Sequence, residues 1–298
     1  MIAGLCKRLF LLTTVHQYPF IFIHREAMPI GPPIIEWLLA KVFQKKIIYD
    51  FDDAIWLTDN LTESKLEKWL RCRWKVASIC KWSYKISCGN EYLAEFASRY
   101  NTSTFVNPTT IDLQKVDQQR EIHIPDSTTE TITIGWTGSH STLKYLISLE
   151  PVLLSLEKKF PSVIFLLIAD QKPKLNLKRW RFVKWNKTSE IKDLLSIDIG
   201  IMPLPDDEWT KGKCGFKALQ YMALNIPAVV SPVGVNSKII SHGINGLLCT
   251  THEEWLEALT TLILNYEIRI KLGAEGRKKV ENHFCVDSNK SNFLSLFN

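Results

Sequence analysis

Short apolar runs alternate along the chain with longer stretches in which apolar residues recur every three or four positions. The runs within 18–26, 45–56 and 162–170 have the length and composition of buried strands. The stretches 34–44 and 149–160 have the periodicity of helices with one buried face. Strands and helices that alternate in this way predict an α/β protein with parallel sheets.

Residues 212–236 combine a glycine turn, an amphipathic helix and a short strand. Gly212 and Gly215 precede the helical pattern, and Lys213 and Lys217 stand one helical turn apart beside it. A glycine turn that enters a helix directs unpaired backbone N–H groups and the positive end of the helix dipole outward. The stretch therefore predicts a phosphate site. An ordinary helix and strand of a parallel sheet, with solvated lysines, explains the same residues equally well.

Two domains fit a chain of 298 residues. Residues 114–130 are polar and without period, which predicts a linker. We therefore expect a first Rossmann-like domain over 1–113 and a second over 131–274, with a closing helix at 275–298 that packs back on the first.

The composition excludes several classes of protein. Hydrophobic residues make up 46% of the chain and charged residues 23%, as in globular proteins. The seven cysteines form no C-x-x-C pair, and no apolar run reaches the length of a membrane span or begins like a signal peptide. These features predict a cytoplasmic protein with reduced thiols. The net charge of +6 suits an anionic ligand or an anionic membrane face.

The segment 65–85 carries three tryptophans and an excess of basic residues on a helical pattern. One interpretation is a helix that faces the core with its apolar side and exposes its basic side to water. The other is a surface helix on lipid headgroups, which would bring the protein to the inner face of the membrane. We expect no nucleic-acid partner, because no known nucleic-acid-binding module accompanies the tryptophans.

The sequence of residues 220–236 resembles the donor-binding segment of GT-B glycosyltransferases, especially the retaining family 4 (group 1). It reads QYMALNIPAVV followed by SPVGVN, and the turn HGINGLLCT at 242–250 is similar to the next motif of that family. The resemblance implies transfer of a sugar from a nucleoside diphosphate donor to a saccharide or lipid-linked acceptor, with retention, in polysaccharide or cell-envelope glycan synthesis. It implies neither a metal nor another cofactor.

The same resemblance implies a set of donor-binding residues. The family's Arg and Lys at the second glycine turn are replaced here by Ser139 and Thr142, and its two glutamates by Gly212 and Gln220. Lys213 and Lys217 would then have to neutralise the diphosphate. Lys184 and Trp185, at the end of an expected strand, would contact the base. The expected donor-binding residues are Gly138, Ser139, Thr142, Lys184, Trp185, Lys213, Gly215, Lys217 and Gln220.

Three carboxylates, Asp50, Asp52 and Asp53, follow an expected strand within four positions. Ligands of open α/β sheets bind outside the carboxyl ends of strands. We therefore expect Asp52 or Asp53 to be catalytic, by steering the acceptor hydroxyl or by stabilising positive charge on the sugar. An equal alternative is that Asp50 and Asp53 cap the loop and the next turn. The family often has a histidine in this neighbourhood, so the aspartates are a departure from it.

Two rival functions follow from other features of the chain. Enzymes of this family have a strand with a glycine-rich turn before the equivalent of Tyr18, and its absence here predicts an incomplete first domain. A non-catalytic protein that binds nucleotide sugars is therefore the alternative. A nicotinamide-dependent dehydrogenase is a weaker rival, because no G-x-G-x-x-G follows a strand.

Overall fold

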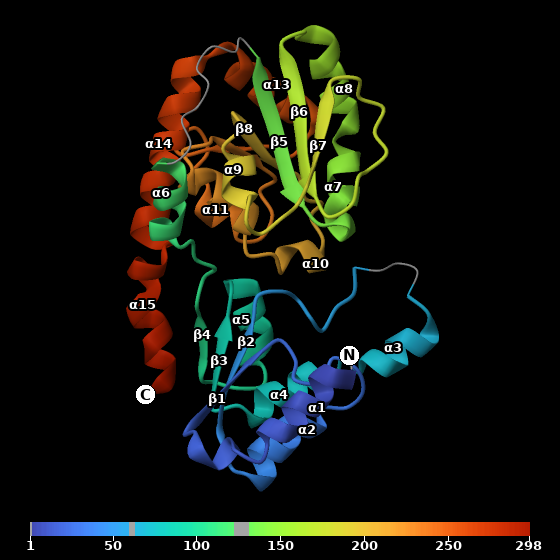
Figure 1. Ribbon diagram of the computed structural model, residues 1–298, viewed down its shortest axis with the longest axis vertical. Helices are drawn as coiled ribbons and strands as arrows, with labels where there is room; N and C mark the ends of the chain where they lie inside the picture. The colour runs from blue at the N-terminus through green and yellow to red at the C-terminus, as the bar shows by residue number, and fades with distance from the viewer. Residues whose placement is uncertain (1, 60–62, 122–130) are drawn as a thin grey trace. The chain divides into compact units, whose positions relative to one another are not determined.

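A computed structural model describes residues 2–59, 63–121 and 131–298. The chain divides into two compact units (Figure 1). The first comprises Met1–Thr109, Asp207–Cys214 and Lys290–Asn298, and the second comprises Thr110–Asp206 and Gly215–Asn289. Each unit has its own parallel sheet and its own apolar core.

The first unit contains a four-stranded parallel sheet in the order β1-β2-β3-β4. Phe22 of β1 pairs with Ile48 of β2, and Ile86 of β3 pairs with Thr104 of β4. β2 is buried along most of its length, which is typical of parallel strands that are covered on both faces. The elements are α1 (Ile2–Leu11), β1 (Phe20–His24), α2 (Ile34–Trp37), β2 (Lys46–Phe51), α3 (Lys65–Arg71), α4 (Lys75–Trp82), β3 (Lys85–Cys88), α5 (Glu91–Ser98) and β4 (Thr104–Val106).

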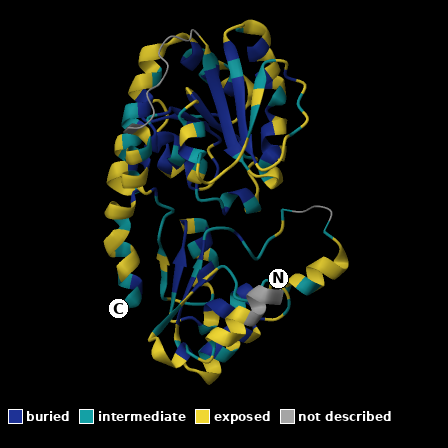
Figure 2. Ribbon diagram, in the orientation of Figure 1, coloured by how far each residue is buried: buried dark blue, intermediate teal, exposed yellow. Residues whose placement is uncertain are grey.

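The basic segment at 65–85 forms two helices and then a strand. Cys72 adopts a left-handed conformation with φ of 47°, which ends α3 before α4 begins. α4 buries Val76, Ile79 and Cys80 in the core, whereas α3 has no buried residue. α4 therefore faces the core, whereas α3 lies on the surface (Figure 2). Contact of this segment with lipid stays a prediction.

The second unit contains a six-stranded parallel sheet in the order β10-β9-β8-β5-β6-β7. Side chains of β6 alternate between two cores, because successive residues of a strand point to opposite faces. Phe165 and Leu167 pack with α7, α8 and α13 on one face, and Leu166 and Ile168 pack with α9 and α11 on the other. The strands are β5 (Ile132–Gly138), β6 (Val163–Ala169), β7 (Trp180–Lys184), β8 (Ile199–Met202), β9 (Ala228–Val230) and β10 (Leu247–Leu248).

Helices cover both faces of this sheet, and its strands β5, β6 and β8 are buried along most of their length (Figure 2). The last long helix, α14, contacts α11, where Gly273 leaves room for the backbone of Asn225. The helices are α7 (Leu143–Ser148), α8 (Glu150–Lys159), α9 (Glu190–Leu194), α11 (Phe216–Ala223), α12 (Asn236–Ile239), α13 (His252–Leu264) and α14 (Tyr266–His283).

The structure differs from the expected linker. Helix α6 (Leu113–Glu121) occupies the start of the segment 114–130, and its Val116 is buried in the core of the second unit. Leu113, the first residue of the helix, packs against the same core. Because most other side chains of this helix are polar, the sequence pattern did not indicate it. The remainder of that segment, 122–130, lies outside the described residues.

Two short stretches from the second half of the chain belong to the first unit. One is Asp207–Cys214, which contains α10 (Glu208–Lys211). The other is Lys290–Asn298, which includes the second half of α15 (Val286–Leu294). Tyr84 Oη donates to the Asn298 carbonyl at 2.8 Å, and Lys85 Nζ donates to the Ser295 carbonyl at 2.7 Å. The last residues of the chain are therefore hydrogen-bonded to Lys85, the first residue of β3, and to Tyr84 before it.

Candidate functional site

A pocket of about 400 Å³ opens in the second unit beyond the carboxyl ends of β5, β6 and β7. The chain runs from β5 to β6 in one direction of the sheet and later returns to β8 on the other side of β5, so the strand order reverses at β5. Open α/β sheets bind ligands at such a switch point. The pocket is lined by Thr137, Gly138, Ser139, Asp170, Trp185, Glu190, Phe216, Lys217 and Gln220.

The turn after β5 supplies one wall. At Gly138 a Cβ would stand 2.5 Å from the Trp136 ring, so only glycine fits there. The Thr142 hydroxyl accepts from the Ser139 amide at 3.2 Å and donates to the Ser139 carbonyl at 3.0 Å. Of the three residues expected here, Gly138 and Ser139 line the pocket, while Thr142 holds the turn in shape.

The beginning of α11 supplies the opposite wall. Gly215 precedes this helix with φ of +70°, a left-handed conformation that glycine adopts without strain. The first residues of the helix, Phe216 and Lys217, line the pocket, and the Lys217 ammonium lies 5.7 Å from the centre of the Trp136 ring. Backbone amides of a helix start, the positive end of the helix dipole and a lysine thus meet on one side of the pocket.

Two carboxylates that the sequence did not single out also line the pocket. Asp170 follows β6 and accepts from the backbone amide of His140 at 2.6 Å and from its ring Nδ1 at 2.7 Å. These hydrogen bonds hold the pKa of Asp170 below its usual range. Because Asp170 ends an expected strand, the rule that led to the aspartates at 50–53 could have found it.

Glu190, in the first turn of α9, is the second missed carboxylate. Its Oε1 accepts from Trp185 Nε1 at 3.0 Å and from Gln220 Nε2 at 3.1 Å. Two predicted residues are therefore joined through a residue that no motif indicated. Lys184 ends β7, is exposed, and is not among the residues that line this pocket.

Lys213 lies in the first unit and does not line this pocket. Its ammonium contacts Asp53 Oδ1 at 2.8 Å and lies 4.7 Å from the centre of the Trp209 ring. The Asn90 side chain donates to the Lys213 carbonyl at 3.0 Å. Within the first unit Lys213 is therefore held by a carboxylate and by the loop after β3. Its expected action on the diphosphate together with Lys217 stays a prediction.

A charged cluster gathers at the carboxyl ends of β1 and β2 in the first unit. Arg25 donates to Asp52 Oδ1 at 2.8 Å and to Asp53 Oδ2 at 2.7 Å. His24 Nδ1 lies 2.6 Å from Asp50 Oδ2. We call these five residues the carboxylate cluster.

The carboxylate cluster contains Asp52 and Asp53 with two partners, His24 and Arg25, that the sequence did not indicate. A catalytic role of Asp52 or Asp53 stays a prediction. The Asp50 side chain binds His24 and Ser87, and that of Asp53 binds Arg25 and Lys213. The capping alternative is therefore wrong for both side chains. His24 and Arg25 directly end a predicted strand, a position that could have indicated them.

The electrostatics of the cluster favour an ionised Asp52. Burial alone would raise the pKa of Asp52, but the hydrogen bond and charge of Arg25 leave that pKa below its usual range. Burial and the neighbouring Asp52 raise the pKa of the Cys214 thiol to about 12, and this thiol donates to the Asp52 carbonyl at 3.2 Å. The Asp52 side chain is 40% exposed and that of His24 is 52% exposed, so both can meet a ligand.

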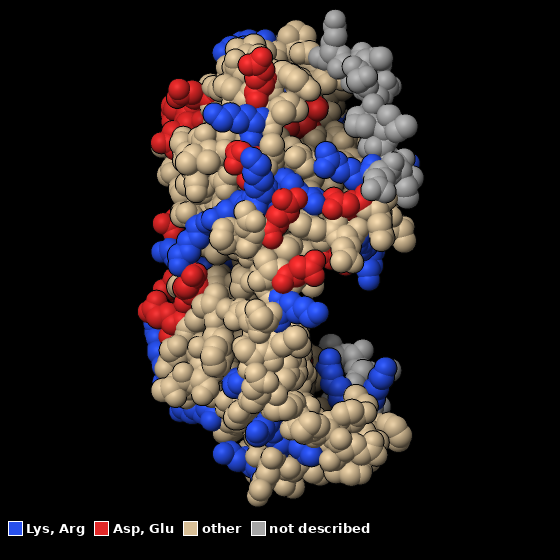
Figure 3. All heavy atoms as spheres, turned by 90° about the vertical axis from the view of Figure 1, so that its left-hand side faces the viewer, with Lys and Arg blue, Asp and Glu red and all other residues tan. Residues whose placement is uncertain are grey.

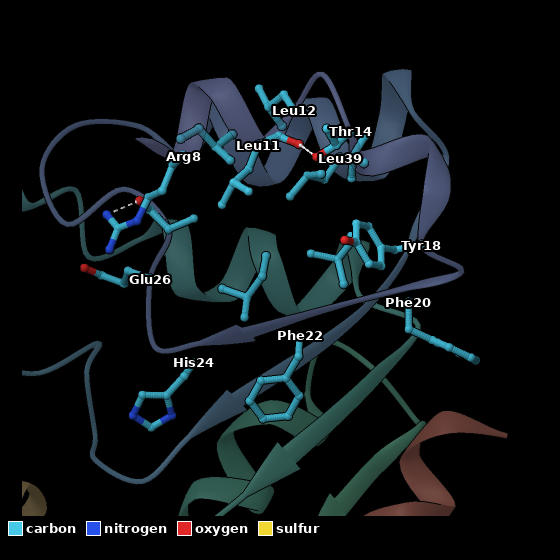
Figure 4. A pocket seen from close by; sticks show the side chains of 15 residues that line it. Arg8, Leu11, Leu12, Thr14, Tyr18, Phe20, Phe22, His24, Glu26 and Leu39 are labelled. Atoms are coloured by element: carbon cyan, nitrogen blue, oxygen red, sulfur yellow. Dashed lines mark hydrogen bonds between the residues drawn. The ribbon is translucent and has the colours of Figure 1, made fainter. Parts of the chain in front are cut away.

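An apolar pocket of about 470 Å³ lies beside the carboxylate cluster in the first unit. Figure 4 shows Phe20 and Phe22 of β1 along it, with Leu11 and Leu12 from the end of α1 and its following turn. His24 lies at one end of this row and belongs to both the pocket and the cluster. The arrangement joins an apolar groove to a polar end.

Comparison with solved structures gives the class of the fold. Sucrose-phosphate synthase from Thermosynechococcus elongatus superposes with a TM-score of 0.71 at 15% identity, over 98% of this chain and 77% of that one. HepE of Anabaena (Alr3699), solved with UDP and glucose, gives 0.71 at 14% identity, over 97% and 80%. TarM of S. aureus gives 0.64 at 15% identity, over 88% and 54%. The fold is that of the GT-B glycosyltransferases.

The sequence adds a match within the second unit. Residues 166–279 match the family described as glycosyl transferases group 1. No curated protein matches the sequence significantly. The predictions of an α/β protein of GT-B architecture and of a glycosyltransferase are confirmed. The assignment to family 4 and the missing first strand stay predictions.

None of the described helices has the length and apolar character that a bilayer span requires.

Proposed function

We propose that this chain transfers a sugar from a nucleoside diphosphate donor to an acceptor, with retention, in the synthesis of a polysaccharide or cell-envelope glycan. The observation that carries the proposal is the pocket of the second unit, in which a glycine turn, the beginning of α11 and Lys217 meet at the switch point of the sheet. Similar folds support a uridine donor: HepE has been solved with UDP-glucose and TarM with UDP.

The diphosphate of the donor would lie between the turn at Gly138 and Ser139 and the first turn of α11. Backbone amides and the Lys217 ammonium there meet the charge that develops on the leaving diphosphate as the glycosidic bond breaks. These groups belong to packed elements, so little reorganisation is needed when the charge appears. Electrostatic stabilisation of the leaving group is then the main catalytic contribution of this pocket.

The nucleoside would occupy the other end of the pocket. Glu190 and Gln220 are already hydrogen-bonded to each other, and a ribose offers two hydroxyls that can donate to the carboxylate. Trp185 is 42% exposed and presents an aromatic face to the base. Glu190 thus takes over the role of the glutamate that the resemblance led us to expect at Gln220.

The carboxylate cluster would receive the acceptor. Asp52 is ionised and partly exposed, so it can accept a hydrogen bond from the acceptor hydroxyl and orient it. The apolar pocket that ends at His24 favours a lipid-linked acceptor over a free saccharide, because a sugar alone would leave the apolar groove in water. Asp53 holds Arg25 and Lys213 in place and so positions Asp52.

Isothermal titration with UDP and GDP, each alone and as a sugar conjugate, tests the donor site. We expect micromolar binding that Lys217→Ala weakens at least tenfold, equivalent to about 1.4 kcal/mol. Lys213→Ala is the matched control: the same charge is lost just before α11, at a residue that does not line this pocket, and binding should change less than about twofold. Equal losses in both variants, or no binding of any nucleotide by the wild type, would refute the assignment of the diphosphate to Lys217.

A non-catalytic protein that binds nucleotide sugars remains the second candidate. The observation that favours it is that each oxygen of Asp53 already has a cationic partner. Donor hydrolysis and transfer to lipid-linked acceptors distinguish the two candidates, and proton NMR of the new anomeric centre reports retention. Binding without turnover in both assays would support the second candidate.

A further inference from the structure

Three large apolar side chains are exposed on and beside α3. Leu66 is 65% exposed, Trp69 73% and Trp74 60%. The two indoles also line an open hollow of about 440 Å³ together with Lys68. Figure 1 shows α3 at the edge of the first unit, away from its four strands. These side chains therefore contribute little to the core of that unit, and their burial elsewhere would be favourable.

Basic residues surround the same side chains. Lys65, Lys68 and Arg71 are exposed, and their side chains form no ion pair within 4.0 Å with the residues that the structure describes. The charge of Arg71 nevertheless acts on the nearby carboxylates Glu63 and Glu26. We call these three cations, with Leu66, Trp69 and Trp74, the α3 surface.

The carboxylates near this surface are already engaged. Glu67 accepts from the Ser64 amide at 2.9 Å in a capping box at the start of α3. Glu63 binds Arg73 through both oxygens, at 2.6 and 2.9 Å. The excess positive charge therefore belongs to Lys65, Lys68 and Arg71. By contrast, positive and negative side chains are interspersed on the face of the second unit seen in Figure 3.

The α3 surface is also fixed in shape. The capping box determines where the helix begins, and the amide of Gly31 donates to the Leu70 carbonyl near its end at 2.7 Å. The backbone that carries these side chains is thus already ordered. Less conformational entropy is then lost when the surface meets a partner.

We propose that the α3 surface binds an anionic lipid bilayer. Tryptophan prefers the level of the headgroups, where the ring is apolar and its N–H can still find a partner, and leucine reaches further in. Lysine and arginine are attracted to the negative surface potential of anionic lipids. Two exposed indoles, a leucine and three exposed cations, on α3 and at the residue before α4, match both properties of such a surface. This inference does not rest on the proposed transferase function.

Cosedimentation with vesicles of phosphatidylcholine, with and without phosphatidylglycerol, tests the proposal on the full chain. We expect the wild type to bind only the vesicles that contain phosphatidylglycerol. The charge variant Lys65→Gln, Lys68→Gln, Arg71→Gln should bind at least about tenfold more weakly, because each cation near an anionic surface contributes about 1 kcal/mol. The apolar variant Leu66→Ser, Trp69→Ser should lose binding to a similar extent.

Matched controls lie in the second unit. Lys158→Gln, Lys174→Gln, Lys271→Gln removes three exposed cations, and Leu264→Ser, Ile270→Ser removes two apolar side chains that are 65% and 53% exposed. Both controls should bind vesicles like the wild type. Circular dichroism and UDP titration, performed on every variant, separate loss of folding or of the donor site from loss of membrane binding.

Several outcomes would overturn the proposal. They are absence of vesicle binding by the wild type, equal binding to both lipid compositions, and α3 variants that bind as the wild type does. If the α3 variants bind as the wild type does, another exposed apolar side chain, such as Phe10, would be the site of attachment. A wild type that dimerises in light scattering, with an apolar variant that does not, would assign the α3 surface to contact between protein chains instead.

Discussion

Replacement of Gly215 by alanine tests whether the entry into α11 is as constrained as the structure indicates. The residue has φ of +70°, and a Cβ there would stand 2.3 Å from Ile239 Cδ1 and 3.2 Å from Asn236 Oδ1. The left-handed conformation alone costs an alanine about 1–2 kcal/mol. The crowding adds about 1–3 kcal/mol, because Ile239 is fully buried and can move only by disturbing the core around it.

Gly243→Ala provides the matched control in the same unit. Gly243 has φ of +77°, but nothing lies within 4 Å of its Cβ position. This variant should therefore show the conformational cost of about 1–2 kcal/mol without the steric one. The difference between the two variants isolates the steric contribution of Ile239 and Asn236.

Hydrogen exchange with mass spectrometry, followed on peptides from α11 and β9, measures the loss of unfolding free energy in each variant. We expect Gly215→Ala to lose about 2–5 kcal/mol of protection, the sum of the two contributions, and to bind UDP more weakly because the amides at the start of α11 shift. Equal destabilisation of the two variants would refute the steric argument. Unchanged UDP affinity in a folded Gly215→Ala protein would refute the placement of the diphosphate at this turn.

Two further predictions concern the carboxylate cluster. Arg25 lowers the pKa of Asp52, so its stabilisation is complete above pH 3.8, the ordinary value for aspartate, and is lost as the pH falls through the lower folded value. The difference in unfolding free energy between wild type and Asp52→Asn should therefore shrink on acidification, and a constant difference would contradict the ion pair. Because the pKa of Cys214 is about 12, iodoacetamide at pH 8 should label Cys214 only after unfolding in urea. Rapid labelling of the native protein, located by peptide mapping, would show that this thiol is not buried beside Asp52.

The sequence determined the architecture because parallel sheets leave a strong local signal. Strands covered on both faces need continuous apolar runs, and the run at 162–170 became β6 with its two faces in two different cores. The glycine turn before α11 was also readable, because a left-handed residue at a helix entry favours glycine. The same local signal failed at Cys72, where a non-glycine residue adopts that conformation and divides an apparently continuous helical pattern.

The tertiary structure alone decided which charged residues meet. Lys213 and Lys217 are four positions apart, yet one pairs with Asp53 in the first unit and the other lines the pocket of the second. Glu190 joined Trp185 to Gln220 through hydrogen bonds that no spacing predicts. Hydrophobic periodicity records how much of each segment is buried, whereas an ion pair depends on the positions of two distant segments. The sequence could therefore specify the sheets and the glycine turn before α11, but only the folded chain could assign partners to the charged residues.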